Sequence, residues 1–579
     1  MTVMLKRLLI FLAGFIFLVA CNAHSDVLHE SYADGTFFGV GDGRGGEIVV
    51  AVTIEGHAIA GIRVVSQAES KFAIPCEEQI IAKVLERQSL DGVDAVSGAT
   101  LTSDGIMAAI QNALNAARGI YVNNEAYSDC SCDVVVVGAG GAGLSSAIEA
   151  ASHGKEVIVL EKQGIIGGNT NFATGGLNAA GTQEQKKRGI EDSLDLFYDD
   201  TMKGGHGFNV TTLVRRMVDG AAEAVEWLKG MGADMSDVGK MAGSSVPRSH
   251  RPAGGAAVGP HLMKVLKQGS DDKAVQIRLH NKVTGLLTDG NGAVTGVRVS
   301  SKKGDYEITS KAVIIATGGF GSNASLIAKL RPELSGFPTS NHSGATGDAL
   351  SWIDGIKADT IHMNFIQTHP TGEKSSHILI TEAIRGNGAI LVNKEGRRFA
   401  NEMIPRDELS NTILGQRGKS AYIVFGESIR QSLAVTENYL MQGLVSQGAT
   451  IQQLATAAGL PADILAATVA EYNGSQASGL DGKFGRTAAD MPRQIDAPYY
   501  CIEVEPVIHH TMGGIRIDDR ARVLHKDGTP VTGLFAAGEV TGGVHGDNRL
   551  GGNAIADIIV FGRIAGAEAA GFLQEQTLH

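Results

Sequence analysis

Arginine, histidine and glutamate residues recur beside glycines in the C-terminal part of the chain. Such groups could hold a carboxylate while a hydride is added to a neighbouring carbon–carbon double bond, because cations stabilise the negative charge that builds up. Taken singly, each arginine is more often half of a surface ion pair and each histidine more often structural. Their joint occurrence favours a catalytic anion site. The residues are His369, Thr381, Glu382, Arg385, Arg406, His509 and Arg549.

The charge balance limits the partners of the chain. Its 579 residues carry a formal net charge of −12, with no long basic run beyond the first residues. A nucleic-acid binder would carry a basic stripe, so we expect no nucleic-acid partner. An acidic chain repels a dianion at long range, and any site for one must therefore be locally cationic. The five cysteines include no Cys-x-x-Cys pair, so neither zinc nor attached haem is supported, and we expect no metal.

A glycine-rich turn between a strand and a helix predicts a dinucleotide site. Residues 134–137 read as a buried strand, and residues 138–143 contain Gly-x-Gly-x-x-Gly. A helix to about Ser152 follows, and then a second buried strand, 157–160. Glu161 ends this βαβ unit, where an acidic side chain can bind ribose hydroxyls.

Each glycine of the turn has a distinct expected role. Gly138 permits the tight turn, Gly140 lets the backbone approach a pyrophosphate, and Gly143 allows helix and strand to pack closely. NAD and FAD sites share this fingerprint, and three later segments favour FAD. These segments contribute Gly168, Asn169, Thr170, Gly318, Gly319, Gly538 and Glu539.

A second set of small and hydroxyl residues, 94–103, immediately precedes a predicted helix at 105–118. The N-terminus of a helix suits a phosphate because its N–H groups are free and its dipole end is positive. A plain helix cap by Thr102, Ser103 or Asp104 is the alternative.

The order of predicted elements gives the domain organisation. Residues 26–122 form a small unit with strands at 47–54 and 58–65 and helices at 77–88 and 105–118. Strands at 312–316 and 533–539 extend the βαβ pattern. We therefore predict an α/β (α+β) fold in which a Rossmann-like domain, 129–363 and 510–579, is interrupted by a capping segment, 364–509. Cys130 and Cys132 are interpreted as linker residues before the first strand, with a disulfide possible.

The N-terminus resembles an export signal. Lys6 and Arg7 precede a short apolar run, 8–20, that is too short to span a bilayer. Residues 1–21 are thus predicted to be a signal peptide. Residues 18–21 resemble a bacterial lipobox, which would make Cys21 a lipidated first residue; ordinary cleavage nearby is the alternative. We expect a periplasmic or exported protein.

Residues 34–118 resemble the FMN-binding domain in which a threonine carries FMN through a phosphoester bond. The shared motif is Ser-Gly-Ala-Thr after an aspartate, and the matching threonine is Thr100. The resemblance implies covalent FMN that relays electrons, attached by a flavin transferase of the host.

From Asp133 to the C-terminus, the chain resembles the FAD-binding flavoproteins of fumarate reductase and succinate dehydrogenase. Members with covalent FAD carry a histidine after the Gly-Gly pair, whereas Asn169 follows Gly168 here. The resemblance therefore implies that FAD is bound non-covalently. Within the family, the chain resembles the soluble, periplasmic fumarate reductases of the flavocytochrome c or urocanate reductase type.

The same resemblance assigns roles to the charged residues. Arg406 would donate a proton to the substrate carbon, and Glu382 and Arg385 would relay protons to it. His509, Arg549 and Arg406 would bind one carboxylate, and His369 and Thr381 the other. Fumarate is the expected substrate.

Other interpretations remain. A sister reductase of urocanate, acrylate, methacrylate or a cinnamate would use the same flavins, and a flavin electron carrier would use them without substrate chemistry. Succinate oxidation is a third, disfavoured by the missing histidine. A membrane quinol dehydrogenase or periplasmic cytochrome would suit as electron donor.

Overall fold

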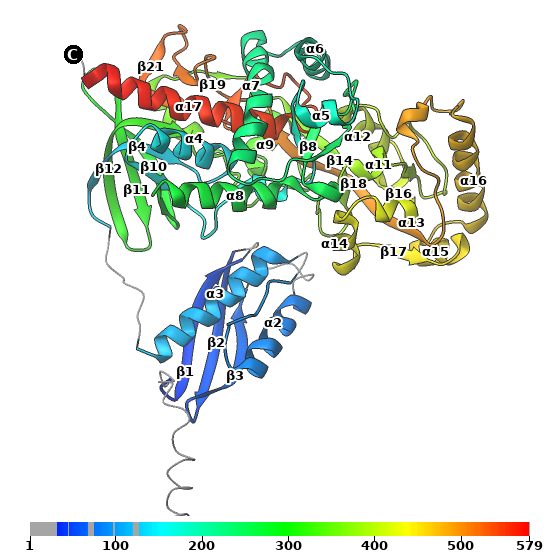
Figure 1. Ribbon diagram of the computed structural model, residues 1–579, viewed down its shortest axis with the longest axis horizontal. Coiled ribbons are helices and arrows are strands. Elements are labelled where there is room, and N and C mark those ends of the chain that lie inside the picture. The colour runs from blue at the N-terminus through cyan, green and yellow to red at the C-terminus, as the bar shows by residue number, and fades with distance from the viewer. Residues whose placement is uncertain (1–31, 44–45, 68–73, 97–98, 120–126, 578–579) are drawn as a thin grey trace, which may run out of the picture. The chain divides into compact units, whose positions relative to one another are not determined.

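The computed structural model describes residues 32–43, 46–67, 74–96, 99–119 and 127–577. The chain forms two compact units, residues 1–124 and 125–579 (Figure 1). The predicted signal peptide, 1–21, and Cys21 lie outside the described residues. Within those residues, none of the helices is both long and apolar enough to cross a membrane.

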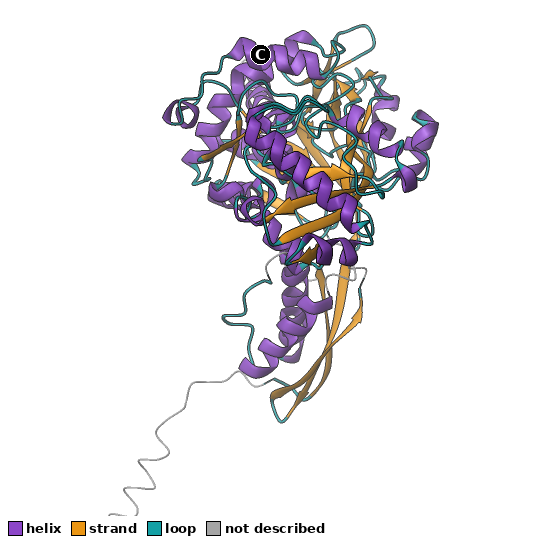
Figure 2. Cartoon of the chain, turned by 90° about the vertical axis from the view of Figure 1, so that its right-hand side faces the viewer, coloured by secondary structure: helices purple, strands orange, loops and turns teal. Residues whose placement is uncertain are grey.

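The N-terminal unit is a small α+β domain. Strands β1 (Gly35–Asp42), β2 (Glu47–Glu55) and β3 (Ala58–Ser66) form an antiparallel sheet in that order. Helices α2 (Ile74–Arg87) and α3 (Thr100–Ala117) pack on one face of it (Figure 2). Both predicted strands are confirmed to within a residue. The second helix begins earlier than predicted, at Thr100 rather than at residue 105.

Close contact between β1 and α3 fixes the start of that helix against the sheet. A Cβ added to Gly39 would lie 2.0 Å from the Ala109 carbonyl oxygen, and one on Gly41 would lie 2.1 Å from that of Gly105. Only glycine permits this approach, so the sequence of β1 presses the sheet directly onto the helix backbone.

The larger unit contains the predicted doubly wound sheet. Its parallel strands are β4 (Cys130–Val137), β5 (Val157–Leu160), β9 (Gln276–Arg278), β12 (Gly304–Ile315) and β21 (Pro530–Ala536). Their spatial order is β9-β5-β4-β12-β21, so the strand order reverses between β4 and β12. Ligands of open α/β sheets bind at such a reversal, beyond the carboxyl ends of the strands. The predicted fold class is confirmed.

Two details differ from the sequence interpretation. Cys130 and Cys132 are not linker residues: they begin β4, and Cys132 pairs with Ser310 of β12. The four described cysteines are free thiols. The sheet also extends antiparallel through β11 (Val294–Ser301) and β10 (Asn281–Thr288). This is possible because β12 is long: its first half pairs with β11, and its last residues pair with β21 along the same edge.

Helices cover the sheet, and the C-terminal helix of the chain packs against the first helix of the βαβ unit. The last helix, α17 (Asn553–Thr577), packs along α4 (Gly141–Ser152), the first helix of the βαβ unit (Figure 1). Gly562 and Gly566 allow this approach, because a Cβ on either would lie within 2.7 Å of an α4 carbonyl oxygen.

The inserted segment has a sheet of its own. Antiparallel strands β14 (Ile366–Glu373), β18 (Tyr499–Thr511), β16 (Ala421–Gly426) and β15 (Ile390–Val392) lie in that order, and β17 (Ser446–Gly448) also pairs with β18. Its helices are α11 (Ala383–Gly386), α12 (Arg406–Leu414), α13 (Glu427–Gln431), α14 (Val435–Met441), α15 (Ile451–Ala458) and α16 (Ala462–Ser478).

The remaining helices and strands complete the larger unit. The helices are α5 (Gln183–Lys187), α6 (Leu194–Gly204), α7 (Thr211–Gly230), α8 (Val258–Asp272), α9 (Ala324–Leu330) and α10 (Leu350–Ile353). The strands are β6 (Leu177–Asn178), β7 (Asp237–Gly239), β8 (Ser249–Arg251), β13 (Thr360–Ile361), β19 (Gly514–Arg516), β20 (Arg522–Leu524) and β22 (Thr541–Gly542).

Candidate active site: a dinucleotide cradle joined to an arginine-lined cavity

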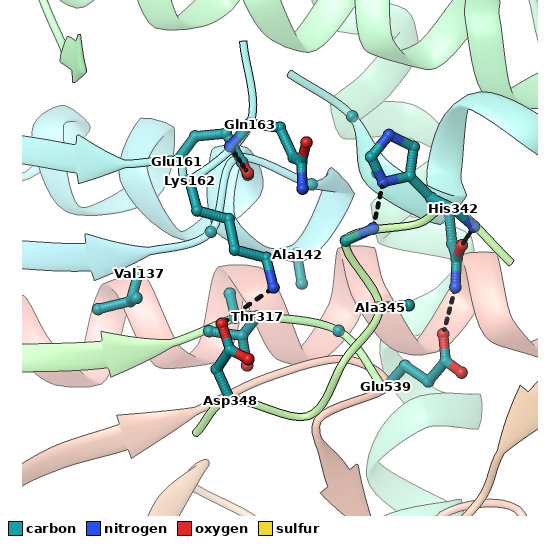
Figure 3. Close-up of a pocket in the computed structure, with 18 of the residues that line it drawn as sticks. Val137, Ala142, Glu161, Lys162, Gln163, Thr317, His342, Ala345, Asp348 and Glu539 are labelled. Atoms are coloured by element: carbon teal, nitrogen blue, oxygen red, sulfur yellow. Dashed lines mark hydrogen bonds and ion pairs between the residues drawn. The ribbon is translucent and has the colours of Figure 1, made fainter. Parts of the chain in front are cut away.

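A cavity of about 860 Å³ opens at the carboxyl ends of β4, β5 and β12. Figure 3 shows its lining, with Glu161 and Lys162 following β5, Thr317 following β12, and Glu539 following β21. The cavity thus lies where the strand order reverses. Of the glycines predicted to hold FAD, Gly138, Gly140, Gly168 and Gly318 line it directly.

The glycine-rich turn could not form with side chains. Gly138 has a φ of 106°, in the left-handed region that favours glycine. A Cβ on Gly143 would lie 1.8 Å from the Gly138 carbonyl oxygen. Gly143, Gly319 and Gly538 are absent from the lining and instead allow close packing: a Cβ on Gly319 would strike Thr511 and one on Gly538 would strike Ala142.

The N-terminus of α4 is prepared for an anion. Among the described residues, no side chain caps this helix through its N-cap position, Gly140, and only the Gly141 amide is bound by a side chain, at 3.1 Å from Thr170 Oγ1. The remaining amides of the first turn are the groups that bind a pyrophosphate. The Thr317 hydroxyl is also buried in the cradle without a protein partner. These orphaned polar groups fit FAD.

Glu161 is held at the cradle by its own turn. Its carboxylate accepts hydrogen bonds from the Ala139 amide (3.0 Å) and the Gln163 amide (2.8 Å). Burial raises the pKa of Glu161, although these amides oppose the rise. Beside it, Lys162 donates to Thr346 and Asp348 (Figure 3). The carboxylate is therefore fixed in position, with lone pairs left for ribose hydroxyls.

Asn169 occupies the position where covalent-FAD relatives carry histidine. Its Nδ2 donates to Asn341 (2.7 Å) and Glu539 (3.2 Å), and its Oδ1 accepts from the His342 amide (2.7 Å). An amide has no nucleophilic nitrogen to form a bond with the flavin. Instead, the hydrogen bonds of Asn169 tie three segments together. Asn169, Thr170, Glu539 and Ile558 line both the cradle and a second cavity, so the two cavities adjoin.

The second cavity, of about 910 Å³, gathers nearly all of the predicted substrate residues. Its lining includes His369, Thr381, Glu382, Arg406, His509 and Arg549. These side chains come from β14, from the segment before α11, from the first turn of α12, from β18 and from the loop after β22. Arg385 does not line the cavity and lies behind Glu382, fully buried.

Glu382 stands between two arginines. The Arg406 Nε donates to Glu382 Oε2 at 2.8 Å, and Arg385 Nη2 lies 3.7 Å from the same oxygen. The other oxygen accepts from the Ala242 amide at 2.6 Å. Burial raises the pKa of Glu382, but the two arginines outweigh it, so the net pKa lies below its usual value of 4.5. Arg406, Glu382 and Arg385 form one continuous chain of charges.

The arginines share a confined space. Burial and the neighbouring Arg406 lower the pKa of Arg549 to about 9, and burial lowers the pKa of Arg385 to about 10. Arg549 Nη1 donates to the Leu550 carbonyl (2.9 Å), while its Nε is buried without a protein partner. Such a cluster of cations needs an anion in the cavity to offset the cost of burial.

Three histidines line the cavity, His369, His509 and His510, and all three are neutral. Burial, then the charge of Arg406, holds the pKa of both His369 and His509 well below its usual range, and burial, then the charge of Arg549, does the same for the pKa of His510. His369 Nδ1 accepts from the Thr371 amide at 3.2 Å, so its proton is on Nε2. The Thr381 hydroxyl accepts from the Ala383 amide at 3.3 Å, which leaves its own proton to donate. Both groups are thus uncharged donors.

Two further residues shape this site without a motif to mark them. Gln367 accepts from Arg406 Nη1 (3.2 Å) and donates to the Arg549 carbonyl (2.8 Å), joining the two arginines. Ser340 holds His509 Nδ1 at 2.9 Å. Amides and hydroxyls of this kind carry no spacing signal in a sequence, so only the fold identifies them.

In the N-terminal unit, Thr100 is the first residue of α3 and its side chain is exposed. Among the described residues, no side chain caps this helix at Ala99. An exposed hydroxyl at the N-terminus of an 18-residue helix fits a phosphate-linked flavin. Ser97 and Gly98 of the motif lie outside the described residues. Ser103, by contrast, is buried and binds the Val96 amide.

Comparison with known proteins agrees with this architecture. The family model for an FAD binding domain matches residues 133–555, and that for an FMN-binding domain matches residues 43–115. A solved structure titled as the open conformation of a flavocytochrome c3 fumarate reductase superposes with a TM-score of 0.65 at 43% identity, over 76% of this chain and 78% of that one.

Three curated relatives illustrate the similarity. Fumarate reductase (cytochrome) of Shewanella frigidimarina is 47% identical over 76% of this chain and 77% of its own length. NADH:fumarate oxidoreductase of Klebsiella pneumoniae is 40% identical over 90% and 57%. Urocanate reductase of Eggerthella lenta is 36% identical over 92% and 91%. The chain therefore belongs to the FAD-dependent oxidoreductase family of these fumarate and urocanate reductases, and it carries an FMN-binding domain ahead of the FAD-binding domain.

Proposed function

We propose that the chain reduces fumarate to succinate. The observation that carries the proposal is the makeup of the second cavity, which adjoins the FAD cradle and shares lining residues with it. Two buried arginines line it together with two neutral donors, the imidazole of His369 and the hydroxyl of Thr381. The arginines suit the carboxylate next to the carbon that gains charge, and the neutral donors suit a second carboxylate.

Bound FAD supplies the hydride, and the residues of the chain do the rest. Arg549 and Arg406, with His509, hold one carboxylate and stabilise the charge that develops on it. His369 and Thr381 hold the other and fix the orientation of the double bond. The Nε and Nη1 groups of Arg406 are engaged by Glu382 and Gln367, so Nη2 is the group that faces the substrate.

Arg406 donates the proton to the second carbon. A guanidinium rarely deprotonates, but a carbanion next to a carboxylate is a far stronger base than water. Reprotonation of the neutral Arg406 then runs through the Glu382 carboxylate, which is hydrogen-bonded to Arg406 and lies 3.7 Å from Arg385. In the proposed path, a proton from solvent passes by way of Arg385 to Glu382, and Glu382 passes it on to Arg406.

Electrons would reach the FAD through FMN attached to Thr100. An exported chain, with or without a lipid on Cys21, would receive them from a membrane quinol dehydrogenase or a periplasmic cytochrome, and a host flavin transferase would attach the FMN. The exposed hydroxyl at the start of α3 supports this route.

Urocanate is the second candidate substrate, because the urocanate reductase relative matches both domains over nearly the full length of each chain. Fumarate is preferred because a dicarboxylate uses both sets of donors in the cavity.

A steady-state assay tests the proposal. Reduced methyl viologen would supply electrons, and kcat/KM would be measured for fumarate, urocanate, acrylate, methacrylate and cinnamate. Fumarate should give by far the highest value. A higher value for another acid would contradict the substrate, and no turnover with both flavins still reducible would leave an electron carrier.

A further inference from the structure

The segment Leu379–Thr381 reaches the cavity without belonging to a helix or strand. The side chains of Leu379 and Thr381 line the cavity, whereas Ile380 is fully buried on the other side. The segment is therefore extended, with alternate residues facing substrate and core. Something else must fix its backbone, because buried amides and carbonyls require partners.

Thr371 of β14 holds the middle of the segment. Its carbonyl accepts from the Ile380 amide at 2.9 Å, and its hydroxyl donates to the Ile380 carbonyl, also at 2.9 Å. The amide of the same threonine donates to His369 Nδ1. One residue thus orients both donors of the proposed second-carboxylate site.

Tyr439 of α14 holds the two ends. Its hydroxyl accepts from the Thr381 amide at 3.0 Å and donates to the Leu379 carbonyl at 3.2 Å. The side chain is only 3% exposed, and burial raises the pKa of its hydroxyl, so the proton that makes the second bond is retained. Tyr439 does not line the cavity.

We propose that Tyr439, acting with Thr371, is a positioning residue that sets the affinity of the site for a second carboxylate through Thr381. The inference rests on the proposed function. Strand β14 pairs with one edge of the segment, through the Leu379–Gly372 bridge and the Ile380 amide. The phenol takes the place of a partner strand along the other edge, and it places the Thr381 hydroxyl where a dicarboxylate can reach it. Its loss leaves a buried amide and carbonyl unpaired, so the segment shifts to recover partners.

Tyr439→Phe removes only the hydroxyl. With the FAD- and FMN-loaded protein, we expect the KM for fumarate to rise about tenfold, equivalent to ~1.4 kcal/mol, while kcat changes by less than about threefold. Tyr500→Phe is the matched control. Tyr500 is also buried and also lies in the inserted segment, 364–509, but its hydroxyl donates to Glu427 rather than to the cavity wall. Tyr500→Phe should leave the KM unchanged.

A double-mutant cycle separates positioning through Thr381 from a general loss of packing. In a Thr381→Ala background, Tyr439→Phe should change the KM by less than about twofold. Thr371→Val should reproduce the increase in KM from the other side of the segment and serves if Tyr439→Phe does not fold.

The outcomes are distinguishable. Wild-type protein that does not turn over fumarate contradicts the proposed function and this inference with it. Wild-type turnover with an unchanged KM in Tyr439→Phe, or a full additional effect in the Thr381→Ala background, overturns the role of the tyrosine alone. Where only Thr371→Val can be measured, an unchanged KM does the same.

Discussion

At the residue scale, a chain of buried charges carries the chemistry. Arg406 contacts the cavity, and Glu382 contacts Arg406 and lies 3.7 Å from Arg385. The other oxygen of Glu382 binds the Ala242 amide, so the carboxylate is held in place between its partners. A proton taken from Arg406 can therefore be replaced along this chain.

Replacing Arg406 by lysine should lower kcat for fumarate by about 10²–10⁴-fold, the range of a lost general acid. Lysine keeps the charge but cannot bind Glu382, Gln367 and substrate together, because its ammonium is a single point. Arg417→Lys is the control, since that arginine is 81% exposed. FAD content should be unchanged in both. Activity near that of wild type in Arg406→Lys would refute the assignment.

Glu382 also links the site to stability. Its pKa in the folded chain is below the usual 4.5, so the carboxylate stabilises the fold above that pH and the stabilisation is lost as the pH falls through the folded value. Melting temperatures of wild type and Glu382→Gln should therefore differ most near neutral pH and converge towards pH 3. A gap of constant size across this range would contradict the linkage.

At the scale of elements, the turn between β4 and α4 and the start of α3 are the two proposed flavin-binding features. At both, no side chain of the described residues caps the helix at its N-cap residue. On the proposed function, the chain uses the same physical device twice, once for a pyrophosphate and once for a single phosphate.

Gly143→Ala should abolish FAD binding. The added Cβ would lie 1.8 Å from the Gly138 carbonyl oxygen, so the turn must open and the cradle amides lose their alignment. Gly474→Ala is the control, because Gly474 is exposed in α16 with nothing within 4 Å of its Cβ position, and alanine there stabilises a helix by up to ~1 kcal/mol. Flavin released on denaturation measures FAD, and retention in Gly143→Ala would disprove the role.

Thr100→Ala should remove all covalent flavin while leaving FAD in place. Flavin fluorescence on a denaturing gel measures the attachment in protein made with a flavin transferase. Thr36→Ala, at another exposed threonine of the same unit, should stay fluorescent. Fluorescent Thr100→Ala protein would show that another residue carries the FMN.

How much of these elements the sequence predicts depends on the range of the interactions. The β4–α4 turn was predictable because its glycines are local and diagnostic, as was the switch from two-residue to helical periodicity around it. The antiparallel extension through β10 and β11 was not, because short apolar strands do not specify their partners. Cys130 and Cys132 were misassigned for the same reason, since β4 begins before its apolar run.

The candidate site shows the same division. Charged residues such as Arg406 and His509 stand out beside glycines, whereas Gln367, Ser340 and Tyr439 do not. Their importance lies in contacts with residues far away in the sequence, and a lone amide or hydroxyl has no spacing rule. Arg385 was predicted to relay protons together with Glu382, and the structure places it behind Glu382, outside the cavity lining.

At the scale of the whole molecule, one chain combines a phosphate site for each flavin with a cavity for a carboxylate. The FAD cradle and the substrate cavity adjoin and share Asn169, Thr170, Glu539 and Ile558 in their linings. The residues that hold the substrate for hydride transfer and the residue that donates the proton come from separate segments of the chain, and these segments meet only in the fold. The larger unit should therefore perform the chemical step without help from the FMN-binding unit.

A single-turnover experiment with Thr100→Ala protein tests this claim most directly. Its FAD would be photoreduced without oxygen, mixed with fumarate, and followed by flavin absorbance, and the succinate formed would be counted by NMR. The account predicts rapid reoxidation of the flavin with one succinate per FAD. A flavin that stays reduced in excess fumarate, in protein with a full complement of FAD, would contradict it.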